Sequence, residues 1–308
     1  LNSYFSSTCT VDNGLLPEFD SPDINPDETF IDAVIFDVPK LCTALRKIKT
    51  KLKYSSGPDG YPIILLLKLA NALVGPLSLI YNSLLSIGKL PSIWKTAVVT
   101  PFYKKGPSSD PANYRPIAQT SIFCKLMERV IVAEVTEYLF KNSMISQHQH
   151  GFLSRRSTAT NLLECLSDWT LAIDNSQSKA IIYIDFMRAF DTVSSQKLVH
   201  KLKKYGITGN LLKFISSFLS DRSQRTRVGR SVSESTRLTS GTVQGSCLGP
   251  LLFLIYINDV CKIFDKNVKP KLFADDLKLY TSIKSDVDQT MLQTYLTRLA
   301  KWAEDWQL

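Results

Sequence analysis

Apolar side chains recur at helical spacing along several segments of the chain. In residues 121–140, Ile122, Leu126, Val130 and Ile131 fall on one face of a helix. Further helices are predicted over residues 41–53, which are basic, over residues 245–260, which are apolar, and over residues 157–174, 196–219 and 286–306. Residues 63–87 are predicted to form two amphipathic helices joined at Gly75-Pro76. A turn is predicted after the first of these helices, at residues 55–60.

Other segments have the pattern of β-strands. Residues 95–102 are rich in Val and Thr, and residues 113–117 bring the chain back. Residues 180–184 form a short apolar run, which is typical of a buried strand. Hairpins are predicted over residues 225–238, about Gly229, and 271–280. The alternation of strands and helices in the second half predicts an α+β fold, an antiparallel sheet with helices on one face.

One apolar run, residues 63–85, is long enough to be considered as a membrane span. Lys68, Asn71, Gly75 and Pro76 interrupt it. A lysine at the centre of a bilayer costs roughly 2.5–3.5 kcal/mol. We therefore expect a pair of amphipathic helices and no association with a membrane.

Charge is distributed unevenly along the chain. The composition, 44% apolar and 21% charged, is that of a globular protein, and the net charge is +9. Residues 1–37 contain eight acids and no Lys or Arg, so the remainder carries +17. With its prolines, the segment 1–39 is predicted to be an acidic, irregular leader. Basic clusters at residues 40–53, 197–204 and 222–237 favour a phosphate-binding surface, although any one of them could be a solvated face.

The cysteines and histidines indicate no metal centre and no disulfide framework. Six cysteines are scattered without a Cys-x-x-Cys pair, which favours a reducing, intracellular compartment. His148 and His150 lack convergent partners in the sequence, so we do not expect them to hold a metal.

Acidic residues stand where two predicted strands end. Asp275 and Asp276 form an acidic turn in the hairpin 271–280, a weak signal alone because Asp favours turns for local reasons. Asp185 ends the apolar run 180–184, 90 residues earlier. Carboxylates at neighbouring strand ends can hold two Mg²⁺ ions roughly 3.5–4 Å apart for in-line phosphoryl transfer. Oxygen ligands without adjacent His or Cys select Mg²⁺ over zinc.

A glycine-rich segment lies between the two acidic positions. Gly241 and Gly245 permit close approach of the backbone to a ligand, and Gln244 can hydrogen-bond a sugar or base. A helix N-terminus capped by Ser246 explains the same residues, and the two interpretations are compatible.

The ordered motifs resemble those of a known family. Tyr183-Ile-Asp185…Ala189-Phe190-Asp191, Gln244-Gly-Ser…Leu248-Gly-Pro-Leu251 and Phe273-Ala-Asp-Asp276 are similar to motifs A, B and C of reverse transcriptases, above all those of LINE-type (non-LTR) retrotransposons. Upstream segments agree: Ser56-Gly-Pro-Asp-Gly60, Trp94-Lys95, Lys104-Lys-Gly106, Asn113-Tyr-Arg-Pro-Ile117, Lys125…Glu128-Arg129 and His150-Gly-Phe152…Arg156-Ser-Thr158. The resemblance covers about residues 40–308.

The resemblance implies a right-hand polymerase with fingers over residues 40–178 and a palm over residues 179–308. It also implies an RNA-directed DNA polymerase that adds dNTPs to a DNA primer on an RNA template with two Mg²⁺ ions. We expect this segment to lack the thumb and the endonuclease of the family. Location in the cytoplasm and nucleus is a further expectation; the oligomeric state stays open.

Site residues follow from matching positions in the motifs. Asp185 and Asp275, with Asp276 beside them, match the catalytic metal ligands. Phe190 matches the aromatic gate that excludes a 2′-hydroxyl, although it could also be a core residue. The remaining matches are Gln244 and Gly245 beside the nascent base pair, Arg115 and Lys104 or Lys105 at the triphosphate, and Gly151, Phe152 and Arg156 at the template.

The sequence departs from the family pattern at a few positions. Val243 stands where Pro is common, Leu153 replaces Arg, Arg155 replaces Gly, and Met187-Arg188 replaces a small residue and Lys. Two other functions are compatible with part of this pattern. A non-catalytic nucleic-acid-binding module of the same fold should have lost Asp185 or Asp275, and both are present. An RNA-dependent RNA polymerase should have a smaller or polar residue in place of Phe190.

Overall fold

The structure is a computed structural model that describes residues 1–20, 22, 29–48 and 56–308. Residues 49–53 of the first predicted helix and Ser55 of the turn after it lie outside this part. The secondary structure elements are, in order, α1 (Asn2–Ser6), α2 (Val38–Arg46), α3 (Ile63–Lys68), α4 (Ala70–Ile87), η2 (Ser92–Lys95), β1 (Thr96–Tyr103), η3 (Pro111–Asn113), β2 (Tyr114–Gln119), α5 (Ile122–Lys141), α6 (Thr158–Asp174), β3 (Ser178–Ile184), α7 (Ala189–Thr192), α8 (Ser195–Lys204), α9 (Gly209–Leu219), β4 (Ser223–Val228), β5 (Ser231–Val232), β6 (Thr236–Arg237), α10 (Gly249–Ile257), η4 (Asn258–Ile263), β7 (Lys269–Phe273), β8 (Asp276–Ile283) and α11 (Asp286–Trp306).

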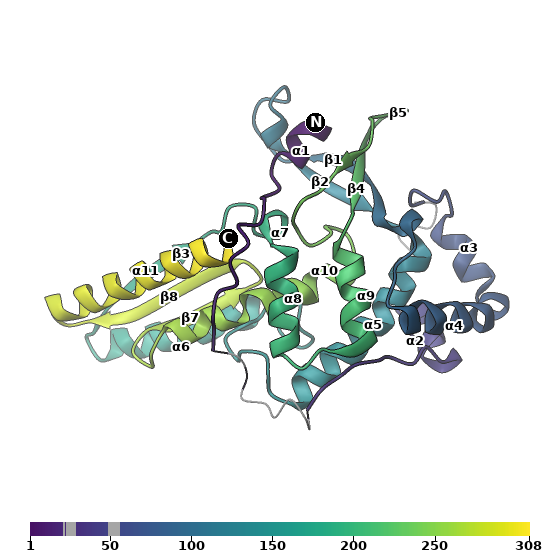
Figure 1. Cartoon of the computed structure of the whole chain (residues 1–308). Helices are drawn as coiled ribbons and strands as arrows, with labels where there is room; N and C mark the ends of the chain where they lie inside the picture. Colours follow the sequence, from purple (N-terminus) through teal and green to yellow (C-terminus); the bar gives the residue numbers. More distant parts are fainter. Residues whose placement is uncertain (21, 23–28, 49–55) are drawn as a thin grey trace.

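A three-stranded antiparallel sheet, β3-β8-β7, confirms the predicted antiparallel sheet for residues 180–184 and 271–280 (Figure 1). The hairpin predicted over residues 225–238 lies in a different sheet, so this part of the prediction is wrong. Helix α6 covers the face that carries Lys271 and Tyr280. Leu272 and Leu277 of the opposite face join the main core, which also contains Leu299 of α11. The prediction that helices cover one face alone is therefore wrong, because side chains alternate and both faces of β7 and β8 are buried.

Strand β3 is not the buried strand that its apolar run predicts. Among the described residues it pairs only with β8, so it is an edge strand. Ile181 is 39% and Tyr183 70% exposed. An apolar run reports a preference for burial, and it cannot report which faces the tertiary fold covers.

A second sheet has the strand order β2-β1-β4-β5, with β6 also paired to β4. The hairpin predicted about Gly229 is confirmed by the pair Val228 and Ser231. Strand β1 pairs with β4 in parallel, which the sequence pattern did not predict. This sheet joins strands from both sides of the division at residue 178, and the fingers and palm boundaries stay predictions.

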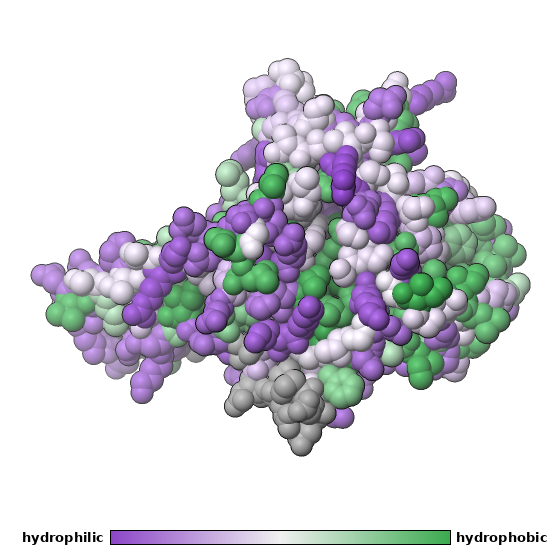
Figure 2. Space-filling view, viewed as in Figure 1, coloured by the Kyte–Doolittle hydropathy of each residue, from purple (hydrophilic) through white to green (hydrophobic). Residues whose placement is uncertain are grey.

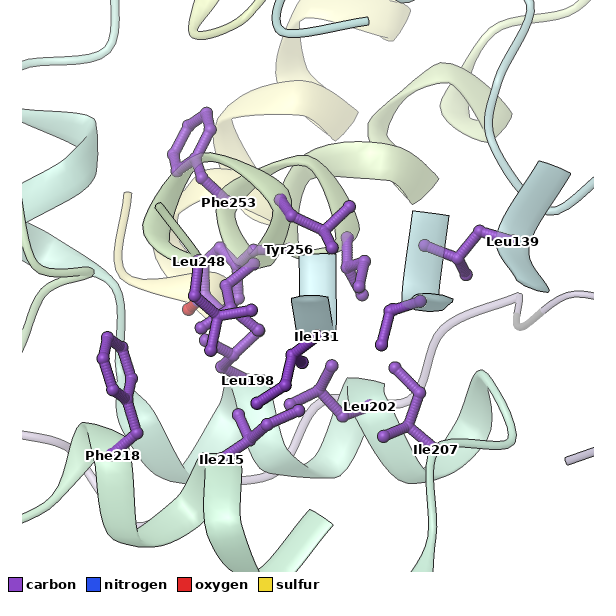
Figure 3. Close-up of a cluster of buried hydrophobic side chains, with 14 of the residues drawn as sticks. Ile131, Leu139, Leu198, Leu202, Ile207, Ile215, Phe218, Leu248, Phe253 and Tyr256 are labelled. Atoms are coloured by element: carbon purple, nitrogen blue, oxygen red, sulfur yellow. The ribbon is translucent and has the colours of Figure 1, made fainter. Parts of the chain in front are cut away.

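The main core lies where α5, α8, α9 and α10 meet (Figure 3). Ile131 of α5, Leu202 of α8, Phe218 of α9 and Phe253 of α10 are fully buried there. Each fully buried apolar side chain contributes about 1.5–3 kcal/mol by its removal from water. This packing fixes α10, and with it the glycine-rich segment before α10.

Three helix boundaries differ from the prediction. Helix α4 continues through Pro76, and the break falls at Leu69, since Leu77 and Tyr81 bury the following turns in the core. The helix predicted over residues 196–219 is two helices, because Gly206 has a φ of +74° and ends α8. Helix α10 begins at Gly249, and the Ser246 hydroxyl accepts a hydrogen bond from its N–H at 2.9 Å.

Apart from α1 and the first two residues of α2, the described residues of the acidic leader form no helix, yet they pack against the body of the protein. Phe5, Val34 and Phe36 are buried. In Figure 1 the first residues run from the second sheet past the C-terminus, where the Asn13 N–H donates to Gln307 at 3.2 Å. The leader is therefore part of the folded unit.

Helix α4 has one packed and one open side. By length and composition it is the one described helix that could cross a membrane. Val74, Leu77, Tyr81 and Leu85 pack into the core. Apolar side chains of the other side, such as those of Leu79 and Ile80, are exposed. Hydrophobic residues gather at the right of Figure 2, where Figure 1 shows α3 and α4. That this run does not span a membrane stays a prediction.

Candidate active site

The acidic residues converge at one edge of the three-stranded sheet. The pair Ile184 and Leu277 sets the register of β3 on β8, which places Asp185 next to Asp276. Phe273 pairs with Asp276 across the hairpin, so the turn consists of Ala274 and Asp275. The turn is thus one residue earlier than the predicted Asp275-Asp276. We call residues 273–276 the catalytic turn.

The local charges disturb the ionisation of Asp275. Burial raises the pKa of this half-buried carboxyl, and the negative charges of Asp276 and Asp185 raise it further, while Arg115 opposes them. Among the described residues, none of the three carboxylates forms an ion pair with Lys or Arg. The site therefore carries an excess of negative charge that a bound cation would relieve.

The donor set fits magnesium and not zinc. In the described part of the chain, no group of three or more His, Cys, Asp or Glu side chains is arranged to hold a metal ion by itself. Mg²⁺ is usually bound by one or two carboxylates together with waters and substrate phosphates, and such a site has no closed cage. Asp185 and Asp275 supply carboxylate oxygens of this kind.

Phe190 lies between two other aromatic rings. It stacks on the buried Phe253, with ring centroids 4.2 Å apart and an interplanar angle of 22°. Phe152 meets it edge-on, at 5.9 Å and 87°. Phe190 is partly buried, so its ring is held by the core and still has an accessible side.

The glycine-rich segment is tied to α7, the short helix that follows Asp185. Gln244 donates from Nε2 to Asp191 at 2.8 Å, and burial raises the pKa of Asp191. Gly245 packs on β2 so closely that an added Cβ would lie 2.2 Å from the Ala118 carbonyl oxygen. A side chain at this position would push the segment away from the second sheet.

Glu128 anchors the other end of this segment. Its fully buried carboxylate accepts hydrogen bonds from the N–H groups of Cys247 at 2.6 Å and Leu248 at 3.0 Å, immediately before α10. Negative charge at a helix N-terminus is stabilised by the unpaired N–H groups and the helix dipole. The sequence placed Glu128 in a motif and gave it no role, since its partners lie 119 and 120 residues away.

Lys104 and Arg115 lie on exposed positions of the β1–β2 hairpin. The Lys104 N–H donates to the Asn113 carbonyl at 2.8 Å, which extends the pairing beyond the strands. The two cations act on different parts of the site: Arg115 lowers the pKa of Asp275, and Lys104 that of Asp191, each against the larger effect of burial.

Gly151 and Arg156 belong to a loop that packs behind the catalytic turn. An added Cβ on Gly151 would lie 2.2 Å from the Ala274 nitrogen. Arg156 donates to the carbonyls of Gln147 and, at 2.6 Å, Gln149, so part of its guanidinium is engaged within the loop. Phe152 is 55% exposed and can contact a ligand. Sequence reasoning gave Gln149 no role.

Comparison with known proteins shows the family to which this α+β fold belongs. The family model described as reverse transcriptase (RNA-dependent DNA polymerase) matches residues 103–308. The chain belongs to the reverse transcriptase family, whose members are nucleotidyltransferases that generally use divalent metals.

Within this family the chain is related to the polymerases of non-LTR retrotransposons. It is 32% identical, over 83% of its length, to a probable RNA-directed DNA polymerase from transposon BS of Drosophila melanogaster. It is 30% identical, over 75% of its length, to the RNA-directed DNA polymerase from mobile element jockey of the same organism. The chain spans 29% and 26% of these two relatives.

Proposed function

We propose that this chain is the catalytic core of an RNA-directed DNA polymerase that adds dNTPs to a DNA 3′-end on an RNA template. The observation that carries the proposal is the convergence of Asp185 and Asp275 at one sheet edge, 90 residues apart in sequence. Residues 40–178 act as fingers and residues 179–308 as palm. The family membership supports nucleic acid and dNTP as partners.

The roles of the residues follow from their positions. Asp185 and Asp275, with Asp276 adjacent, would hold two Mg²⁺ ions. These ions would lower the pKa of the primer 3′-hydroxyl and neutralise charge developing on the triphosphate. Arg115 and Lys104 extend from the hairpin as cations for the triphosphate oxygens. Gln244 and Gly245 line the position of the nascent base pair.

Sugar selection is assigned to Phe190. Because Phe253 supports one face of its ring, the ring cannot retreat from a 2′-hydroxyl without disturbing the core. This favours a DNA product over an RNA product. Gly151, Phe152 and Arg156 lie on the loop behind the turn, and the template passes the exposed ring of Phe152 in this proposal.

Substitution of the metal ligands tests the function in a primer-extension assay on an RNA template. We expect Asp275→Asn in the full-length protein to lower the extension rate at least about 100-fold, since metal ions contribute several kcal/mol of charge stabilisation. Asp174→Asn, at an exposed acid that ends α6, is the matched control and should extend normally. Full activity of Asp275→Asn, or an inactive but folded wild type, would favour the non-catalytic nucleic-acid-binding module.

A further inference from the structure

The loop 147–151 is hydrogen-bonded to the strand that leads into the catalytic turn. The His150 N–H donates to the Leu272 carbonyl at 2.8 Å, and the Leu272 N–H donates to the His148 carbonyl at 2.9 Å. These bonds form a parallel bridge centred on Gln149 and Leu272. The loop therefore acts as a short additional strand beside β7.

From this bridge the Gln149 side chain reaches the turn itself. Its Oε1 accepts hydrogen bonds from the N–H groups of Ala274 at 3.0 Å and Gly151 at 2.7 Å. Its Nε2 donates to the Ala274 carbonyl at 3.3 Å. Gln149 is 2% exposed, so one buried amide satisfies both polar backbone groups of the residue before Asp275.

Ala274 needs such support because its backbone is strained. Its φ is +58°, in the left-handed region that residues with a Cβ rarely adopt. A two-residue hairpin turn requires this conformation at its first position. Strained backbone persists where the surroundings hold it, and Gln149 with the closely packed Gly151 forms those surroundings.

We propose that Gln149 is a positioning residue of the polymerase, which fixes the catalytic turn so that the Asp275 carboxylate faces Asp185 before any ligand binds. The effect of Gln149 on DNA synthesis rests on the proposed function. Its effect on the conformation of the catalytic turn does not, because the turn is already restrained in the free protein. Gln149 touches no substrate and acts through Ala274.

Two variants of Gln149 separate hydrogen bonding from packing. Gln149→Met has a similar volume and no hydrogen bond, so we expect amide hydrogens of residues 272–277 to exchange at least about tenfold faster in the metal-free protein. Gln149→Glu keeps the acceptor for the Ala274 and Gly151 N–H groups but loses the donor to the Ala274 carbonyl, so its exchange rates should lie between those of the wild type and Gln149→Met. In primer extension, Gln149→Met should raise the Mg²⁺ concentration for half-maximal rate about 10-fold, as loss of groups that orient metal ligands does.

Asn258 offers a matched control. It is another buried amide with three hydrogen bonds, to Ser146, Met144 and Tyr205, and none to the turn. Asn258→Leu should lower the melting temperature without changing exchange at residues 272–277 or the Mg²⁺ midpoint. Unchanged exchange in Gln149→Met would overturn the proposal, as would equal effects of both variants on the turn. If Gln149→Met exchanges faster than the wild type at residues 272–277 but the wild type extends no primer, the proposed function is refuted and the restraint of the turn by Gln149 is not.

Discussion

At the scale of single residues, the side chains that hold the site together are buried polar groups with distant partners. Glu128 accepts hydrogen bonds from two backbone N–H groups before α10, and the Gln149 side chain hydrogen-bonds the N–H and the carbonyl of Ala274. A buried polar group without a partner costs about 1–3 kcal/mol, so each of them specifies one arrangement of its segment. Glu128 thereby restrains the end of the glycine-rich segment, and Gln149 restrains the residue before Asp275.

The aromatic stack at Phe190 predicts a change in sugar selection. Phe190→Val removes the ring that rests on Phe253 and opens space beside the incoming sugar. We expect incorporation of ribonucleotides relative to deoxyribonucleotides to rise about 10-fold or more, since a steric difference of this size is equivalent to 1–3 kcal/mol. Competitive single-nucleotide extension measures it. Phe190→Tyr keeps the ring and should discriminate like the wild type; unchanged discrimination in Phe190→Val would remove the gate role.

At the scale of elements, a buried ion pair connects helices whose contact the sequence pattern does not predict. Lys201 of α8 is fully buried and forms an ion pair with Asp259 of η4. The Trp302 indole of α11 donates to the same carboxylate at 3.0 Å, and the Lys201 Nζ lies 3.6 Å from the centroid of the Trp306 ring. One lysine thus connects three elements, and it is unavailable to phosphate.

Burial of Lys201 predicts a pH dependence of stability. Burial lowers the pKa of Lys201 from 10.5 to about 8, and Asp259 opposes the change. Between these values the unfolded chain binds more protons, so the free energy of unfolding rises with pH by up to about 1.4 kcal/mol per unit. Below pH 8 both states are protonated and the effect is absent.

Urea unfolding between pH 7 and 10 measures this effect. The unfolding free energy of the wild type minus that of Lys201→Met should increase as the pH rises. Lys203→Met, at an exposed position of the same helix, should show a constant difference. A constant difference for Lys201→Met as well would contradict the prediction.

At the scale of the whole molecule, the positive charge is arranged differently from what its clusters predict. Of the cluster 197–204, Lys197 and Lys201 are fully buried with partners in the protein. Arg222 is also buried, and its guanidinium donates hydrogen bonds to the carbonyls of Phe218 and Trp94. Exposed basic residues of the cluster 222–237, such as Arg225, remain available to a polyanion.

The net charge of +9 predicts salt-sensitive binding of primer–template. If the protein neutralises four phosphates, affinity should fall roughly 100-fold between 50 and 200 mM salt, because binding releases condensed counterions. Titration of a labelled primer–template at several salt concentrations measures the slope. A neutral osmolyte at equal osmolality should have little effect, and a flat salt response would contradict binding through phosphates.

The sequence by itself determined most elements and the identity of the chemical groups. Apolar periodicity predicted α5 and α11, and an apolar run that enters an acidic turn predicted the β7–β8 hairpin. The ordered motifs identified Asp185 and Asp275 as candidates, because residue type and order along the chain can be read from the sequence without knowledge of the fold. Local signals also misplaced boundaries, as at Pro76 and Gly206, where packing and a left-handed glycine decided the ends of the helices.

Only the tertiary structure decided which groups meet. It joined β1 to β4 in parallel, left β3 at an edge, and withdrew Lys197 and Lys201 from the surface. It also assigned partners to Gln149 and Glu128, more than 100 residues away in sequence. Hydrogen bonds and burial depend on distances in space. These distances are set only when the core packs, so the pattern of residue types along the chain does not give them.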